Sequence, residues 1–308
     1  MHPYLGSGPY CYANSLAMVL GAAAPSPSVI EVLTGSPFGI ELFAGRLPLF
    51  DPYGWDPDRG LDDAIALLGW TCQRQGADDE QQALALLRDA VKAGPVLAGP
   101  MEVGLLRHQP EMTGPIGSDH FVCVLEADEE LILFHDPQGF PYATLPARDF
   151  LAAWRADTIP YEATPYTMRA GFRRVHDVTD EAALRAALPG AVAWLRGRND
   201  LAVPPGTAGG AAAARRLADQ VAGGLDADVY GHLVYFAIKV GARRLSDAAG
   251  ALTSIGHDQA AAVATRQARL VGSLQYDIVA GADESAAETL RELAPTYDEL
   301  ADTLTEST

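Results

Sequence analysis

Cys11, His120 and Asp136 are the residues whose types and order could together perform a chemical reaction. Cys11 follows a Gly8-Pro9 turn and opens an apolar stretch with helical character. The dipole and free N–H groups of a helix N-terminus favour a thiolate there. A thiolate attacks a carbonyl carbon, a histidine moves the proton, and a carboxylate keeps the imidazole in one tautomer. These three residues therefore predict acyl chemistry through a thioester on Cys11.

His120 and Asp136 are predicted to lie on the two strands of one hairpin. Two apolar runs flank an acidic turn at 127–130. If residue 126 pairs with residue 130, His120 falls opposite Asp136 on the same face, with Cβ atoms about 5 Å apart. His135 then points to the other face. A slip of one residue would break this pairing, so the prediction depends on the turn.

The elements around these residues predict two domains, over residues 1–176 and 177–308. The first has helices followed by strands, which indicates an α+β domain, and the second is alanine-rich with a 3.6-residue apolar period, which indicates an all-α domain. After the Cys11 helix, the predicted elements are helices over 25–33, 61–68, 79–92 and 147–154; strands over 95–101, 120–126, 131–136, 142–145 and 167–175; and helices over 179–188, 208–222, 228–242, 244–254, 257–280 and 283–304.

Charge and cysteine content exclude several functions. The chain of 308 residues has a net charge of −18 and no basic stripe, which argues against nucleic acid as a partner and favours cationic or amine-bearing substrates. Its three cysteines lack metal-ligand spacing, so we expect no metal, no cofactor and a reducing compartment. No apolar run is long enough to span a membrane and no signal peptide is evident, which predicts a cytoplasmic protein without a membrane partner.

The order of the three residues also carries a family resemblance. The segments HFVCVL at 120–125 and LILFHDPQG at 131–139 resemble papain-like cysteine peptidases, especially bacterial enzymes that process double-glycine leaders. The segment YCYANSL at 10–16, with a helical domain behind it, resembles the butirosin biosynthesis protein H family of papain-type acyltransferases. The resemblance covers residues 1 to about 176 in architecture, and the helical domain matches in kind only.

This resemblance implies a papain-like cysteine-peptidase fold followed by an all-α C-terminal domain. It further implies a thiol acyltransferase of natural-product or antibiotic biosynthesis. Such an enzyme moves an acyl group from a thioester donor, an acyl carrier protein or a coenzyme A conjugate, to an amine or similar small-molecule acceptor. Ring closure of a bound acyl thioester would use the same cysteine.

The chain departs from the peptidase pattern at Leu5. Papain-like peptidases generally carry an oxyanion-hole glutamine six residues before the cysteine, and no glutamine precedes Cys11 here. Ser7, Tyr10 and Asn14 are the alternatives for that side chain, and the Cys11 N–H is a backbone donor. Loss of one donor costs roughly 10²–10³ in rate on an amide, whereas a more reactive thioester tolerates the loss. The departure favours acyl transfer over proteolysis.

Tyr10 and Tyr12, which flank Cys11, and Gln138, just beyond Asp136, are predicted to line the substrate site. Two other functions are compatible with the same residues. A cysteine peptidase or amidohydrolase would use the same triad to cleave peptides or small amides. A catalytically inactive papain-like binding module would keep the fold while the thiol stayed inert.

A carrier-protein donor requires a basic docking area, because carrier proteins are usually acidic and this chain is too. Arg169, Arg173 and Arg174 form the first predicted patch, and Arg243-Arg244 the second. A small diffusible coenzyme A conjugate would need neither. The oligomeric state is left open.

Overall fold

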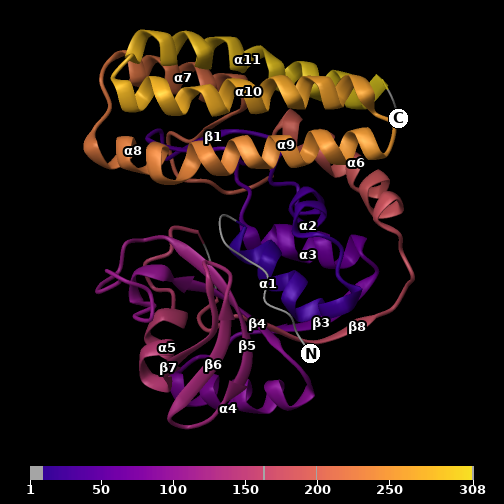
Figure 1. The fold of residues 1–308 in the computed structure, drawn as a ribbon, viewed down its shortest axis with the longest axis vertical. Coiled ribbons are helices and arrows are strands. Elements are labelled where there is room, and N and C mark those ends of the chain that lie inside the picture. Colours follow the sequence, from indigo (N-terminus) through magenta and orange to yellow (C-terminus); the bar gives the residue numbers. More distant parts are fainter. Residues whose placement is uncertain (1–9, 162–163, 199, 307–308) are drawn as a thin grey trace. The chain divides into compact units, whose positions relative to one another are not determined.

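The structure, a computed structural model, describes residues 10–161, 164–198 and 200–306. The chain divides into two compact units, one of residues 1–27 with 68–177 and one of residues 28–67 with 178–308. The first is a mixed α+β unit and the second is mostly helical (Figure 1). The predicted boundary after residue 176 lies one residue from this division. Residues 28–67, predicted in the first domain, instead group with the helices.

A six-stranded antiparallel sheet organises the first unit, in the order β3-β8-β4-β5-β6-β7. Its strands are β3 (Trp70–Gln75), β4 (Val96–Glu102), β5 (Asp119–Ala127), β6 (Leu131–Asp136), β7 (Phe140–Pro146) and β8 (Met168–Arg174). Its helices are α1 (Cys11–Leu20), α4 (Glu80–Ala90) and α5 (Ala147–Trp154), with short 3₁₀ turns at Gly21–Ala23 (η1), Val91–Ala93 (η2) and Val103–Leu105 (η3).

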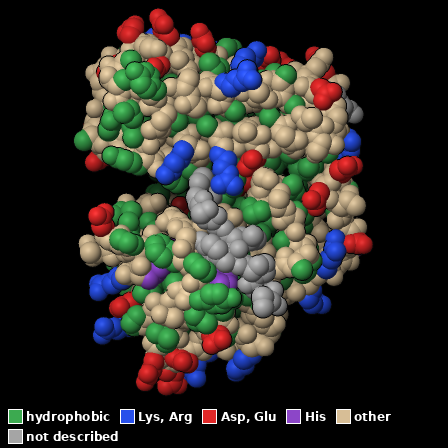
Figure 2. Space-filling model, viewed as in Figure 1, with side chains coloured by type: hydrophobic (Ala, Val, Ile, Leu, Met, Phe, Trp, Pro, Cys, Tyr) green, Lys and Arg blue, Asp and Glu red, His purple; other side chains and the backbone are tan. Residues whose placement is uncertain are grey.

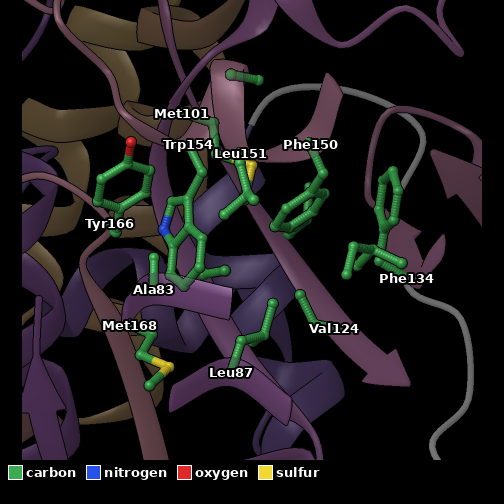
Figure 3. Close-up of a cluster of buried hydrophobic side chains, with 14 of the residues drawn as sticks. Ala83, Leu87, Met101, Val124, Phe134, Phe150, Leu151, Trp154, Tyr166 and Met168 are labelled. Carbon is green, nitrogen blue, oxygen red and sulfur yellow. The ribbon is translucent and has the colours of Figure 1, made fainter. Parts of the chain in front are cut away.

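One hydrophobic core joins α4 and α5 to the sheet. Figure 3 shows Phe150 and Trp154 of α5 gathered with Leu87 of α4 and with Val124 and Phe134 of the central strands. Burial of such large apolar side chains contributes about 1.5–3 kcal/mol each relative to exposure. The core therefore holds β5 and β6, the two strands that carry His120 and Asp136, as a rigid base.

Helix α1 is anchored to β5 at Phe121. The Ser15 hydroxyl donates to the Phe121 carbonyl at 3.0 Å, and the Tyr12 ring meets the Phe121 ring edge-on at 6.1 Å between centroids. Nine of the ten α1 residues, all but Cys11, are buried, as expected for a helix that is apolar on every side. This anchoring positions the start of α1 beside residue 120.

The second unit combines a small sheet with a helical bundle. The sheet has the order β2-β1-β9. In the bundle, α11 packs on α7 and on α10, and α10 also packs on α9. The elements are α2 (Pro27–Leu33), β1 (Glu41–Phe43), β2 (Leu47–Leu49), α3 (Pro57–Leu67), α6 (Asp180–Arg196), β9 (Ala208–Gly209), α7 (Gly210–Ala222), α8 (Ala227–His232), a π-helical turn η4 (Leu233–Ala237), α9 (Ile238–Ser254), α10 (Asp258–Ala280) and α11 (Asp283–Glu306).

Two predicted helix ends are wrong. Helix α6 continues through Pro189 to Arg196, because Trp194 and Leu195 are buried beyond the proline and their packing outweighs the lost hydrogen bond. Helix α9 runs without the predicted break near residue 243, because Arg244 is held in buried ion pairs in mid-helix.

Candidate functional site

Cys11 is the first residue of α1 and follows an unusual backbone conformation. Tyr10 lies in the left-handed region, with φ 83° and ψ 43°, and its side chain is buried. A bulky residue is strained there and keeps this conformation only when its surroundings enforce it. The Asn14 N–H donates to the Tyr10 carbonyl at 2.8 Å, which starts the helix at once. Cys11, a half-buried residue, is thus held at the helix N-terminus.

His120 and Asp136 are fully buried and directly joined. His120 Nε2 lies 2.8 Å from Asp136 Oδ1. The other ring nitrogen, Nδ1, is buried and makes no hydrogen bond of ordinary geometry to the described residues. Cys11 and His120 are close enough that each shifts the pKa of the other. Because Asp136 occupies Nε2, we infer that Nδ1 is the nitrogen that faces the thiol.

The predicted hairpin register, with His120 opposite Asp136, is wrong. Cys123 pairs with His135, and the same register continued places His120 opposite Gln138. Diagonal neighbours on one face of a sheet still meet when their side chains are long enough. His120 reaches Asp136 along such a diagonal.

A bulge in β5 keeps these two side chains on one face. Near the turn, Glu126 pairs with Leu133, and the register shifts by one residue at Leu125. Without that shift every pairing nearer the site would move by one residue, and His120 would point away from Asp136. The bulge is therefore part of the site.

His135 points away from the triad, as predicted. The Tyr142 N–H donates to His135 Nδ1 at 3.0 Å, and the two rings pack at 4.4 Å between centroids. His120, which contacts Asp136, is therefore the candidate for the reacting histidine.

Burial and pairing oppose each other in the electrostatics of the triad. Burial raises the pKa of the Cys11 thiol, and His120 lowers it only in part, so it stays above its usual value. Burial lowers the pKa of His120, but Asp136 and Cys11 outweigh it and raise that pKa to about 10. Burial raises the pKa of Asp136, but His120 and the hydrogen bonds to its carboxylate hold it well below its usual range.

At neutral pH these shifts leave a thiol beside an imidazolium–carboxylate pair. Desolvation of the sulfur is the largest effect on the Cys11 thiol, and stabilisation of its thiolate by the helix N-terminus stays a prediction.

Two residues that contact Asp136 are not among the predicted catalytic or substrate-binding residues. His108 Nε2 and Gln109 Nε2 each lie 2.7 Å from Asp136 Oδ2. Both belong to the segment after η3, outside the hairpin, where no periodicity connects them to Asp136. The available signal was the pairing of two side-chain donors, His108-Gln109, in one loop.

Of the three residues predicted to line a substrate site, two are buried and one is exposed. Tyr10 and Tyr12 are buried, and the Tyr12 ring packs on Phe121. The Gln138 side chain is exposed, and its backbone N–H donates to Asp136 Oδ1 at 2.8 Å.

The structure describes only some of the residues considered for the oxyanion hole. Leu5 and Ser7 lie outside the described residues. Asn14 is described and is buried within α1. The Cys11 N–H stays a prediction for this role.

The predicted basic patches are not continuous surfaces. Arg169 is fully buried in β8, whereas Arg173 and Arg174 are exposed. Arg244 is buried and pairs with Glu31. Figure 2 shows basic and acidic side chains scattered over the face it presents, rather than gathered into one basic area.

No three His, Cys, Asp or Glu side chains in the described part of the chain are arranged to hold a metal ion. Within the same residues, no single helix has the length and hydropathy needed to cross a membrane. The bent pair of 11–23 with 27–33 meets that test by length and composition only.

Comparison with known proteins gives two related matches. Residues 204–305 match the family model of the YobF C-terminal domain. The chain is similar to the uncharacterized protein YobF of Bacillus subtilis (strain 168), with 38% identity over 161 residues, which are 51% of this chain and 52% of that protein. The chain thus spans about half the length of the curated relative it matches. It is homologous to YobF and carries a YobF C-terminal domain. Neither match names the butirosin biosynthesis protein H family, so that resemblance stays a prediction.

Proposed function

We propose that this protein is a papain-like thiol acyltransferase that uses Cys11 to move an acyl group from a thioester donor to an amine or similar small molecule. The observation that supports it is the chain of contacts from Cys11 through His120 to Asp136. A nucleophile, a base and a group that orients the base are the parts that acyl transfer needs. By resemblance, the acceptor belongs to natural-product biosynthesis.

Because His120 is already an imidazolium, the Cys11 thiol first loses its proton to solvent. In the first half-reaction the resulting thiolate attacks the carbonyl carbon of the donor thioester. The carbon–sulfur bond of the donor breaks, and its sulfur leaves with the proton of the His120 imidazolium. The product is an acyl-Cys11 thioester beside a neutral His120.

In the second half-reaction the acceptor amine attacks the acyl-Cys11 carbonyl. Neutral His120 takes the proton of the amine, and Cys11 leaves as a thiolate beside the renewed imidazolium. Asp136 keeps its charge throughout and stabilises the imidazolium in both half-reactions.

Intact-protein mass spectrometry after exposure to a panel of acyl thioesters tests this function. We expect a mass increase equal to one acyl group on the wild type, and none on Cys11→Ala. Cys72, which is half-buried, provides the internal control, and Cys72→Ala should keep the adduct. Loss of the adduct when an amine is added, with release of the acylated amine, would establish transfer. Release of the free acid or cleavage of peptides would instead favour the hydrolase alternative.

A non-catalytic binding module is the second candidate, because burial raises the pKa of Cys11. Iodoacetamide distinguishes the two. A catalytic Cys11 is alkylated at a rate that increases with pH and that depends on His120. An inert Cys11 resists alkylation at every pH at which the fold survives.

A further inference from the structure

Asp136 receives four hydrogen bonds. Its Oδ1 accepts from His120 Nε2 and from the Gln138 backbone N–H, each at 2.8 Å. Its Oδ2 accepts from the side chains of His108 and Gln109, each at 2.7 Å. A carboxylate has about four lone-pair positions, so the group is saturated and its orientation is set from both oxygens.

The two donors to Oδ2 come from one loop, which is tied down at a separate buried carboxylate. Glu102, at the end of β4, accepts backbone N–H groups from Gly104 at 3.0 Å, Ile116 at 3.0 Å and Gly117 at 2.9 Å. The Thr158 hydroxyl also donates to it. Both ends of the segment that carries His108 and Gln109 are therefore attached to the same side chain.

Aromatic side chains fix the His108 ring. It meets Phe134 at 5.0 Å and Phe140 at 5.3 Å between centroids, edge-on in both contacts. Its side chain is 9% exposed. A ring held this way has little freedom to leave Asp136, and its Nε2 must carry the proton because a carboxylate can only accept.

We propose that His108 and Gln109 are positioning residues, which hold Asp136 Oδ2 so that Oδ1 stays against His120 Nε2. The inference rests on the proposed function, because it gives the two residues a part in presenting His120 to Cys11. The loop from 106 to 118 is then a component of the site, and its tether at Glu102 is the second support for the same geometry.

Four variants test this proposal, and Arg107→Ala is the matched control because Arg107 is an exposed neighbour in the same loop. His108→Phe keeps a ring without a donor, and Gln109→Leu keeps volume without one. His108→Gln keeps a donor near the place of Nε2, and a double variant of His108→Phe with Gln109→Leu removes both donors. The readouts are the histidine NMR titration of His120 and the pH profile of Cys11 alkylation by iodoacetamide.

Loss of a donor should loosen Asp136 from His120. We expect His108→Phe and Gln109→Leu each to lower the pKa of His120 by about one unit and to slow alkylation at pH 8 by about tenfold. The double variant should show the larger change, and His108→Gln and Arg107→Ala should stay near the wild type. Folded variants with an unchanged or raised His120 pKa would overturn the proposal.

The wild-type protein offers a test that does not depend on whether the variants fold. Nitrogen-15 NMR should find the proton of His108 on Nε2, and a proton on Nδ1 with a bare Nε2 would refute the inference. Both NMR readouts are independent of acyl chemistry. If no acyl adduct forms on Cys11 while the titrations behave as expected, the proposed function fails and the positioning role stands.

Discussion

Asp136 and Glu41 are both buried carboxylates beside strand ends, yet their surroundings push them in opposite directions. Asp136 lies among four donors, and its pKa falls well below its usual range. Glu41, at the start of β1, accepts the Gly54 N–H at 3.0 Å and is near Asp51. Burial and the neighbouring negative charge raise the pKa of Glu41 to about 8.

Burial acts in the same direction on both groups, so it does not decide the charge. The number of donors and the sign of the nearest charge decide it. At pH 7 Asp136 is a carboxylate that can hold an imidazolium, and Glu41 is mostly a neutral acid. The first arrangement suits a reacting site, and the second suits a structural interior.

Removing the charge of Asp136 should have the largest effect. In Asp136→Asn, burial is opposed only by the smaller effect of Cys11, so the pKa of His120 should fall well below about 10. By analogy with other triads, the acyl-transfer rate should drop by roughly 10²- to 10⁴-fold. Alkylation and acyl-adduct kinetics measure this. Arg107→Ala is the control, because Arg107 is an exposed neighbour of His108. Equal losses in both variants would contradict the argument.

The sequence predicts the three residues of the candidate site but not their geometry. Cys11, His120 and Asp136 came from residue type and chain order, which a sequence displays directly. The register did not, because the hairpin turn and the bulge at Leu125 each change it and leave no periodic signal. The contacts of His108 and Gln109 with Asp136 could not be predicted for a related reason. Their link to Asp136 is a tertiary contact made by a loop, which no local pattern encodes.

The fold shows the same division between local and tertiary signals. Helices α4 and α5 and strand β6 follow their apolar patterns closely. Strand β3 has a polar, half-exposed sequence, and its formation depends on pairing with β8. Helix α6 passes through Pro189, where buried residues further along override a local stop signal.

Arg244 lies in the unit that contains Glu41, and it pairs with buried carboxylates there. Its guanidinium pairs with Glu31 at 2.8 Å and with Asp51 at 3.1 Å. Arg244→Met leaves buried negative charge without this cation, so we expect a loss of about 3–5 kcal/mol in unfolding free energy. Urea denaturation measures it. Arg243→Met, at a half-exposed neighbour, is the control and should change little.

Glu41→Gln should stabilise the protein at alkaline pH. The folded state holds the Glu41 proton up to about pH 8, whereas the unfolded chain releases it near pH 4.5. The folded state therefore binds more protons in this window, and stability falls as pH rises from about 4.5 to about 8. The variant should remove that slope and gain on the order of 1–4 kcal/mol at pH 8.

Denaturation midpoints of wild type and Glu41→Gln across that pH range provide the measurement. Glu126→Gln, at an exposed position of β5, is the matched control. If the wild-type slope persists in Glu41→Gln, the raised pKa does not belong to Glu41.

Asp128 is an exposed carboxylate that accepts hydrogen bonds, so it shows the effect of donors without burial. Its substitution should have the smallest effect on stability. Its carboxylate accepts the Glu130 and Leu131 N–H groups at 2.8 Å each, and these bonds lower the pKa of Asp128 although it is exposed. Asp128→Asn keeps an oxygen that accepts both bonds, and solvent screens the lost charge. We expect an unchanged thermal midpoint and an unchanged Cys11 alkylation profile.

A destabilisation as large as that of Arg244→Met would mean that donors stabilise a carboxylate as strongly in water as in the interior. The contrast between Asp136 and Glu41 would then need another cause. An unchanged midpoint means that donors set the charge of a carboxylate, and that burial determines how much that charge matters to the fold.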